Sequence, residues 1–335
     1  IWIQAGIREC ERDFMRFLVT GATGNVGREV IKDLMRTGED VCAAVYEAQI
    51  SQVEGAPALR FDFRDEATWG PALAGTTKVF LMRPPDMADV EATLIPFLQQ
   101  ANAHGVQQIT FLSLIGVDKN KKIPHYAVEQ AILASGIPWT FVRPGFFMQN
   151  ASQAYRDDIR FDDRIYVAAG NGKLGFIDVR DIGAVAGKSL REEGHRNKVY
   201  AITGAEALTH AEIAAIISNA VGRTITYANP SNRDYKDHLL RMGYPQDFVD
   251  VMSGIYFPVR MGWAGGLTDE FAALMGRPPI RFEQFAHDFA NLWAAPTQAE
   301  RGARAAKLAA IPPPPRRGLW EKIKGIFSTP ERIGA

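Results

Sequence analysis

The sequence predicts an α/β fold in which a doubly wound parallel sheet is followed by a smaller C-terminal α+β lobe. Between residues 15 and 150, short runs rich in β-branched and aromatic residues alternate with longer segments of helical periodicity. A glycine-rich turn joins the first short run to the first helical segment. After residue 144 the elements become shorter and mixed. Regular alternation of this kind is typical of βαβ units, which build parallel sheets.

Six strands separated by helices are expected in the first domain. The strand candidates are apolar runs at residues 16–20, 41–46, 58–61, 78–82, 108–113 and 138–143. The helix candidates at residues 26–37, 89–104 and 124–135 are each followed directly by a glycine, a common helix stop. In an open sheet of this class, the ligand site lies at the carboxyl ends of the strands, near the point where the strand order reverses.

The second lobe is expected to cover the sheet and to bind the substrate. Its strand candidates are residues 164–168, 175–179 and 198–203, and its helix candidates are residues 209–221, 234–242 and 245–252. The chain is thereby divided into an N-terminal extension (1–14), a dinucleotide-binding domain (15–150), a substrate lobe (151–294) and a tail (295–335).

The tail combines two kinds of sequence. Residues 295–315 are rich in alanine and proline, which predicts a semi-rigid linker. Residues 316–328 are basic and amphipathic, with apolar side chains at helical spacing. Such a segment could lie on an anionic membrane, dock on a partner protein, or pack on its own subunit or on a dimer mate.

The composition excludes several classes of protein. The 335 residues are 47% hydrophobic and carry 38 basic and 38 acidic side chains, so no direct nucleic-acid partner is expected. The two cysteines and six histidines show no metal-ligand spacing, and no metal is predicted. No run of 18 apolar residues occurs, and the low cysteine content favours a cytoplasmic location.

Residues 20–27, Thr-Gly-Ala-Thr-Gly-Asn-Val-Gly, lie between the first strand and the first helix. Gly21 permits a tight turn, Gly24 lets the backbone approach a pyrophosphate, and Gly27 lets the helix pack closely on the strand. The helix start adds free N–H groups and partial positive charge. The turn predicts binding of NAD(P)H by seven consecutive residues: Gly21, Ala22, Thr23, Gly24, Asn25, Val26 and Gly27.

Together with residues 79–85, 109–113 and 135–145, this turn resembles the NmrA-like branch of the atypical short-chain dehydrogenase/reductases. The resemblance extends over about residues 15–293. It implies a Rossmann-type sheet and an NAD(P)H cofactor. The branch includes quinone reductases, reductases of azo and triarylmethane dyes, and redox-sensing transcriptional regulators.

The resemblance also implies further cofactor contacts, at Tyr46, Asp62, Phe63, Arg83, Pro84 and Pro144. The second strand ends at Tyr46-Glu47, where similar proteins often carry arginine. Glu47 could bind ribose hydroxyls and favour NAD, whereas Arg28 could meet a 2′-phosphate, so both coenzymes stay open. Asp62 resembles an adenine contact; alternatively, it caps a helix that starts near Asp65.

The catalytic residues depart from the larger family, whose Tyr-x-x-x-Lys pair supplies a proton and holds the ribose. Tyr126 is followed four residues later by Gln130. The candidates left are Ser113, which resembles the family's serine, and His125, which could donate a proton because histidine titrates near neutral pH. Alternatively, His125 contacts the cofactor without chemistry.

Two functions follow from this pattern. The first is an oxidoreductase that passes hydride to a quinone-like or azo-like aromatic acceptor, which needs little beyond a flat apolar pocket. Candidate walls of that pocket are Phe146, Phe147, Met148, Tyr155, Tyr256, Phe257 and Trp263, although most such residues belong to protein cores. The alternative is a non-enzymatic redox sensor that binds NAD(P) and acts through a protein partner.

Overall fold

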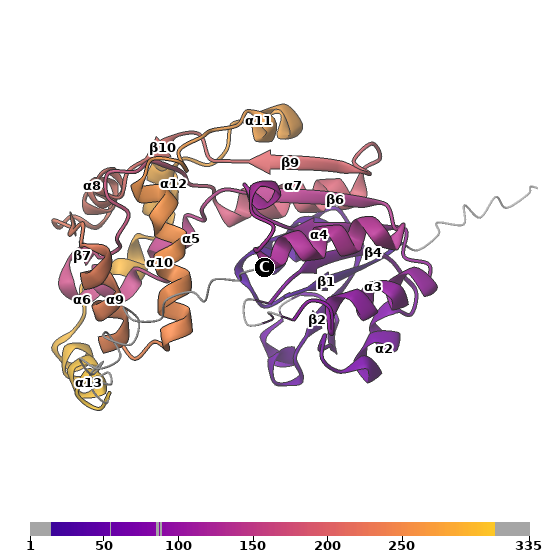
Figure 1. Ribbon diagram of the computed structural model, residues 1–335, viewed down its shortest axis with the longest axis horizontal. Coiled ribbons are helices and arrows are strands. Elements are labelled where there is room, and N and C mark those ends of the chain that lie inside the picture. The colour runs from indigo at the N-terminus through magenta and orange to yellow at the C-terminus, as the bar shows by residue number, and fades with distance from the viewer. Residues whose placement is uncertain (1–14, 54, 85–86, 88, 312–335) are drawn as a thin grey trace, which may run out of the picture.

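The computed structural model describes residues 15–53, 55–84, 87 and 89–311. The predicted N-terminal extension (1–14) and the amphipathic part of the tail (316–328) lie outside the described residues. Figure 1 shows the strands of the sheet side by side, with helices on both faces and the second lobe beyond one end of the strands.

All six strands expected in the sheet are confirmed. They are β1 (Arg16–Thr20), β2 (Asp40–Val45), β3 (Ala58–Arg60), β4 (Thr76–Met82), β5 (Gln108–Leu112) and β6 (Trp139–Pro144). The sheet has the order β3-β2-β1-β4-β5-β6-β9, and its neighbouring strands pair in parallel. The doubly wound, Rossmann-type fold is thus confirmed, with the strand order reversing between β1 and β4.

The seventh strand, β9 (Lys198–Ile202), corrects the expectation of a six-stranded sheet. The sequence pattern predicts this run in the second lobe, but it pairs with β6 from Thr140 to Pro144. The helix before it, α7 (Val179–Arg191), packs on α1 (Asn25–Arg36) on one face of the sheet. We therefore propose that the sheet domain includes residues 179–202 as well as residues 15–150.

The opposite face of the sheet carries α2 (Trp69–Leu73), α3 (Leu94–Ala103) and α4 (Pro124–Ser135). The helix ends at Gly38, Gly105 and Gly136 are confirmed, because each of these glycines has a positive φ that favours glycine. Helix α3 begins five residues later than expected. The preceding residues form a turn in which the Asp89 side chain accepts a hydrogen bond from the Ala92 N–H.

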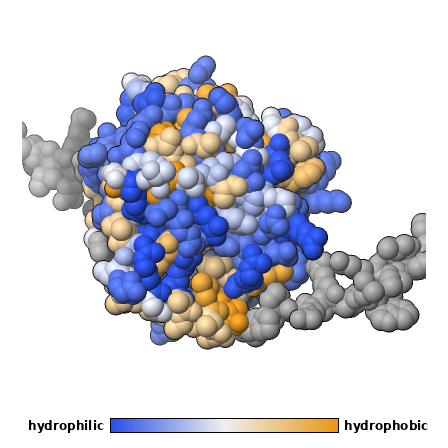
Figure 2. All heavy atoms as spheres, turned by 90° about the vertical axis from the view of Figure 1, so that its left-hand side faces the viewer, coloured by the Kyte–Doolittle hydropathy of each residue, from blue (hydrophilic) through white to orange (hydrophobic). Residues whose placement is uncertain are grey.

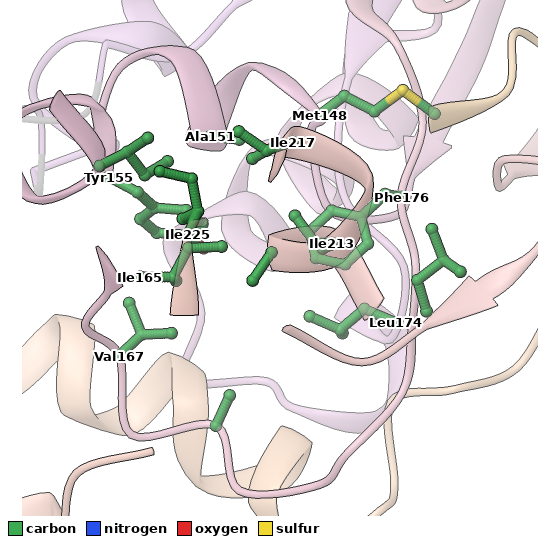
Figure 3. Packing of buried hydrophobic residues seen from close by; sticks show 14 of the residues in the cluster. Met148, Ala151, Tyr155, Ile165, Val167, Leu174, Phe176, Ile213, Ile217 and Ile225 are labelled. Atoms are coloured by element: carbon green, nitrogen blue, oxygen red, sulfur yellow. The ribbon is translucent and has the colours of Figure 1, made fainter. Parts of the chain in front are cut away.

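The second lobe has its own core and two small sheets. Strand β7 (Arg164–Ile165) pairs with β11 (Thr226–Tyr227), and β8 (Leu174–Gly175) pairs with β10 (Ala207–Leu208). Its helices are α5 (Gln149–Ser152), α6 (Arg156–Asp162), α8 (His210–Val221), α9 (Asn232–Arg241), α10 (Gln246–Arg260) and α12 (Phe282–Asp288), while α11 (Glu270–Met275) contacts β9 and α7. Figure 3 shows aliphatic side chains of α8 facing Phe176, Leu174 and Ile165 in this core.

The expectation of a linker is wrong for residues 298–309, which form α13 (Gln298–Ala309). Thr297 and Glu300 form a capping box at its start, and alanine has the highest helix propensity. Arg304 pairs with Asp162 at 2.9 Å, which ties the helix to the end of α6. In the part of the chain that the structure describes, no helix has the length and apolar character needed to cross a membrane.

Candidate functional site

Most of the predicted site residues lie at one edge of the sheet, where the parallel strands end. The glycine turn follows β1, Tyr46 follows β2, and Asp62 lies two residues after β3. Arg83 follows β4 and Ser113 follows β5. Pro144 is the last residue of β6, and its carbonyl accepts a hydrogen bond from the Ile115 N–H of the neighbouring loop. The edge includes the reversal between β1 and β4, where open α/β sheets bind ligands.

The glycine turn is shaped by close backbone contacts. Gly21 has a φ of +61°, and a Cβ atom there would lie 2.1 Å from the Met82 side chain. A Cβ atom on Gly27 would lie 2.2 Å from the Gly21 carbonyl oxygen. These two positions therefore require glycine for the turn itself. Gly24 is less crowded: its nearest contact would be 3.1 Å away, at the same carbonyl oxygen.

Helix α1 begins directly at this turn. Its N-cap is Gly24, which has no side chain to accept a hydrogen bond, and its first turn contains no acidic residue. The N–H groups of the first turn have no acceptor within the helix. The partial positive charge of the helix start is thus left for an external anion, so the residues present fit the pyrophosphate of a dinucleotide.

The loop after β2 borders this turn. The Thr23 hydroxyl lies 3.1 Å from the side-chain oxygen of Gln49, which follows β2. Tyr46, in the same loop, is 36% exposed. Glu47 lies 3.6 Å from Arg60, so it already has a basic neighbour. The choice between NAD and NADP therefore stays open at this loop.

Asp62 and Phe63 have different surroundings. One carboxylate oxygen of Asp62 accepts a hydrogen bond from the Arg64 N–H at 2.9 Å. The alternative reading of Asp62 as a helix cap is wrong, since Asp65 itself caps the short helix that follows. The Phe63 ring is buried against Phe61 at 4.7 Å, so a cofactor contact at Phe63 has to come from its main chain.

His125 lies at the start of α4, where its ring is 6.0 Å from that of Phe111 in β5. Burial and the nearby Arg83 guanidinium lower the pKa of His125 to about 4. The expectation of titration near neutral pH is therefore wrong, and the imidazole is neutral at pH 7. Its Nδ1 atom is buried without a hydrogen-bond partner among the described residues. Arg83 itself donates to the carbonyl of Pro84 at 2.8 Å.

Ser113 belongs to a buried polar cluster that the sequence analysis did not predict. Its hydroxyl donates to Glu129 Oε1 at 2.6 Å, and Glu129 is only 2% exposed. Arg143 donates to the same carboxylate from Nε at 2.9 Å and from Nη2 at 2.6 Å. Asp118 lies 3.8 Å from Arg143. Because the Ser113 proton is directed at a carboxylate, the remaining lone pairs of the hydroxyl oxygen can only accept a hydrogen bond.

The candidate acceptor walls divide into two groups. Met148, Tyr155 and Tyr256 are fully buried in the core of the second lobe. In contrast, Phe257 is 54% exposed and Trp263 is 71% exposed, with their rings 5.9 Å apart. Phe146 and Phe147 are partly buried at the end of β6. The first three residues therefore serve packing, and the other four are left as candidates for the pocket.

Two further residues at this edge were missed. Glu129 carried a sequence signal, because it is an acidic side chain on an otherwise apolar helix face next to Val128 and Ile132. Gln153 carried none: its side-chain amide exchanges two hydrogen bonds with Asn25, at 2.9 and 2.7 Å. This pair joins the glycine turn to the end of α5, which comes 128 residues later.

The chain is similar to known NAD(P)H-dependent proteins in both sequence and structure. The NmrA-like family matches residues 15–259. The NAD(P)H azoreductase of Xenophilus azovorans is 35% identical over 278 residues, which cover 80% of this chain and 96% of that protein. A solved structure of an NADPH-dependent quinone oxidoreductase from Escherichia coli, complexed with NADPH, has a TM-score of 0.71 and 27% identity; the match covers 81% of this chain and 99% of the other.

A third comparison concerns the fold alone. The triphenylmethane reductase of Citrobacter sp. has a TM-score of 0.69 and 24% identity, and the match covers 82% of this chain and all of that one. The family match spans more than half of the chain and includes the glycine turn, the Ser113–Glu129–Arg143 cluster and most of the second lobe. The chain therefore belongs to the NmrA-like family.

Proposed function

We propose that the chain is an NAD(P)H-dependent reductase that passes hydride to a quinone-like or azo-like aromatic acceptor. The observation that carries the proposal is the glycine turn before the uncapped start of α1, with Ser113 and His125 at the same edge of the sheet. Family members named as NAD(P)H- and NADPH-dependent reductases support the broader statement that the chain is an NAD(P)H oxidoreductase. The low cysteine content favours a cytoplasmic location.

The glycine turn and the start of α1 would hold the pyrophosphate through backbone N–H groups. When bound, the reduced nicotinamide supplies the hydride. Ser113 would accept a hydrogen bond from the nicotinamide carboxamide or from the acceptor, because its own proton is held by Glu129. His125 is neutral at pH 7 and would donate a hydrogen bond from one ring nitrogen.

The acceptor class follows from what the site offers. Neither Ser113 nor neutral His125 is an efficient acid, which disfavours ordinary carbonyl reduction at this edge. Quinones and azo dyes accept hydride into an extended π system and can take their proton from water. Such acceptors need flat apolar walls, for which Phe146, Phe147, Phe257 and Trp263 are the candidates.

Titration of the purified protein with NADH and NADPH, followed by addition of menadione or a simple azo dye, tests this proposal. Quenching of tryptophan fluorescence reports binding, and loss of the absorbance of the reduced nicotinamide reports hydride transfer. We expect both signals. Tight binding without turnover would support the redox sensor instead, and absence of binding would refute the assignment of the glycine turn.

A variant pair makes the test specific. Gly24→Val places a branched side chain in the turn, with its Cβ atom 3.1 Å from the Gly21 carbonyl oxygen, and is expected to abolish nucleotide binding. Gly70→Ala in α2 is the matched control, because a Cβ atom there meets nothing within 4 Å. The control is expected to bind as the parent does. Equal binding by the two variants would contradict the proposed pyrophosphate site.

A further inference from the structure

The second lobe exposes an unusual concentration of large apolar side chains. Of the fifteen such side chains exposed in the described residues, eight lie between residues 244 and 267: Tyr244, Phe248, Val251, Ile255, Phe257, Met261, Trp263 and Leu267. Figure 2 shows the outer face of this lobe, which is largely hydrophilic but has apolar atoms gathered along its lower edge. Exposed apolar side chains that gather in one region are typical of a contact with another surface.

Four of these residues form a stripe along the start of α10. Phe248, Val251 and Ile255 are spaced by three and four residues, which places them on one side of α10, and Tyr244 lies two residues before the helix. The Tyr244 and Phe248 rings are stacked 4.7 Å apart, and Val251 is 60% exposed. We call these four residues the α10 stripe. Phe257, nine residues after Phe248, lies about 180° around the helix, so the stripe is separate from the proposed acceptor wall.

The described chain ends beside this stripe. Helix α13 leads to Ile311, whose side chain would lie 3.3 Å from a Cβ atom on Gly243. Gly243 directly precedes Tyr244, so the last described residue lies next to the first member of the stripe. Twenty-four residues follow Ile311. The nearest apolar residues among them are thus held at high effective concentration at the α10 stripe.

The sequence after Ile311 complements the stripe. Leu319, Trp320, Ile323, Ile326 and Phe327 recur at spacings of three and four residues, as the α10 stripe does. The eight residues from 312 to 319 can span at most about 28 Å, which exceeds the roughly 11 Å between Phe248 and Ile255 along the helix. The tail is also basic around these residues, at Arg316, Arg317, Lys322 and Lys324.

Charge also favours a contact between the tail and the α10 stripe. Asp247 lies beside the α10 stripe on the exposed side of the helix. Asp250 pairs with Lys236 at 2.8 Å, whereas Asp247 makes no ion pair with another residue that the structure describes. A basic amphipathic segment laid on the stripe would bury apolar surface and bring Lys322 or Lys324 toward the Asp247 carboxylate.

We propose that residues 319–327 dock on the α10 stripe of the same chain. The contact is an intramolecular helix-in-groove interaction whose apolar residues cover Tyr244, Phe248, Val251 and Ile255. It does not depend on the proposed reductase activity. A second copy of the chain and an anionic membrane are the competing surfaces for the same tail residues, and the experiment separates them.

Disulfide trapping in the full-length chain tests the proposal. In a Cys10→Ser background, where the remaining Cys42 is buried, Val251→Cys is combined with Ile323→Cys. Val251→Cys with Glu321→Cys is the matched control, because residue 321 lies off the apolar side of the segment. We expect the first pair to form an intrachain disulfide about fivefold faster than the control, independently of protein concentration. Equal rates, or disulfides only between chains, would overturn the proposal.

Hydrogen exchange gives a second readout that needs no engineered cysteine. Ile323→Glu is expected to raise exchange in peptides covering residues 246–255 about tenfold, while Glu321→Ala, off the apolar side of the segment, leaves it unchanged. Protection that disappears on dilution would indicate a dimer contact and contradict the intrachain contact. A different outcome is that the protein floats with phosphatidylserine vesicles while α10 stays unprotected from exchange when no vesicles are present. That result would show that the tail binds the membrane, and it would overturn the proposal.

Discussion

The Glu129–Arg143 pair provides the sharpest test of how the structure supports Ser113. The Glu129 side chain is 3% exposed and that of Arg143 is 18% exposed, and two short hydrogen bonds join them. Arg143→Met leaves the carboxylate buried without its cation. Removing one partner of a buried pair costs about 3–5 kcal/mol, so we expect a loss of that size in the free energy of unfolding.

The double variant should recover most of this loss. Glu129→Met leaves Arg143 partly exposed beside Asp118 and removes the acceptor of the Ser113 hydroxyl, which together cost about 2–3 kcal/mol. Glu129→Met/Arg143→Met removes both charges and leaves one buried hydroxyl unsatisfied, at about 1–2 kcal/mol. The loss in the double variant is therefore expected to lie about 5 kcal/mol below the sum of the single losses.

Urea unfolding at pH 7, followed by circular dichroism, measures these differences from the shift of the midpoint at a common slope. Lys32→Met is the control, because the Lys32–Glu29 pair is 2.7 Å long but the Lys32 side chain is 69% exposed. The control should lose less than about 1 kcal/mol. A loss below about 1 kcal/mol in Arg143→Met, or additive losses in the double variant, would refute the buried-pair reasoning.

Three further predictions concern the hydroxyl, acid stability and the glycine turn. Ser113→Ala should lower kcat/KM about tenfold, which is the equivalent of one hydrogen bond. Ser135→Ala, at the end of α4, is the control and should leave kcat/KM unchanged. An unchanged kcat/KM in Ser113→Ala would remove the serine from the site. Burial lowers the pKa of His210 to about 4 in the folded chain, below its unfolded value, so its contribution to stability is present above pH 6.5 and is lost as the pH falls toward 4. His210→Gln should therefore reduce by about 3 kcal/mol the stability lost between pH 7 and 4, as measured by urea unfolding, and an unchanged acid loss would contradict this. Gln153→Ala, which breaks the amide pair with Asn25, should raise the Kd for NADPH about fivefold in a fluorescence titration, and an unchanged Kd would show that the pair does not support the turn.

Local sequence patterns determined the elements around the sheet. The six predicted strands and the glycine turn depend on residues within one segment, such as the short apolar run before Gly21 or the helix stop at Gly136. The position of the site followed from the same patterns, because parallel strands all end at one edge. The placement of Ser113 and Arg83 at that edge was therefore predictable without knowledge of the packing.

Properties that depend on distant neighbours were decided by the tertiary structure. The run at 198–202 is a typical strand by sequence, but only its pairing with β6 shows that it extends the sheet. The neutral state of His125 arises from burial and from Arg83, which lies 42 positions earlier in the chain. The Ser113 hydroxyl is left to accept a further hydrogen bond because the fold brings it within 2.6 Å of Glu129, 16 residues later, to which it donates its proton. The sequence by itself thus determined the fold class and the edge at which cofactor binding is proposed, since both follow from periodicity and turn chemistry. Only the tertiary structure decided the protonation and hydrogen-bonding roles at that edge, because these depend on desolvation and on contacts between separate elements.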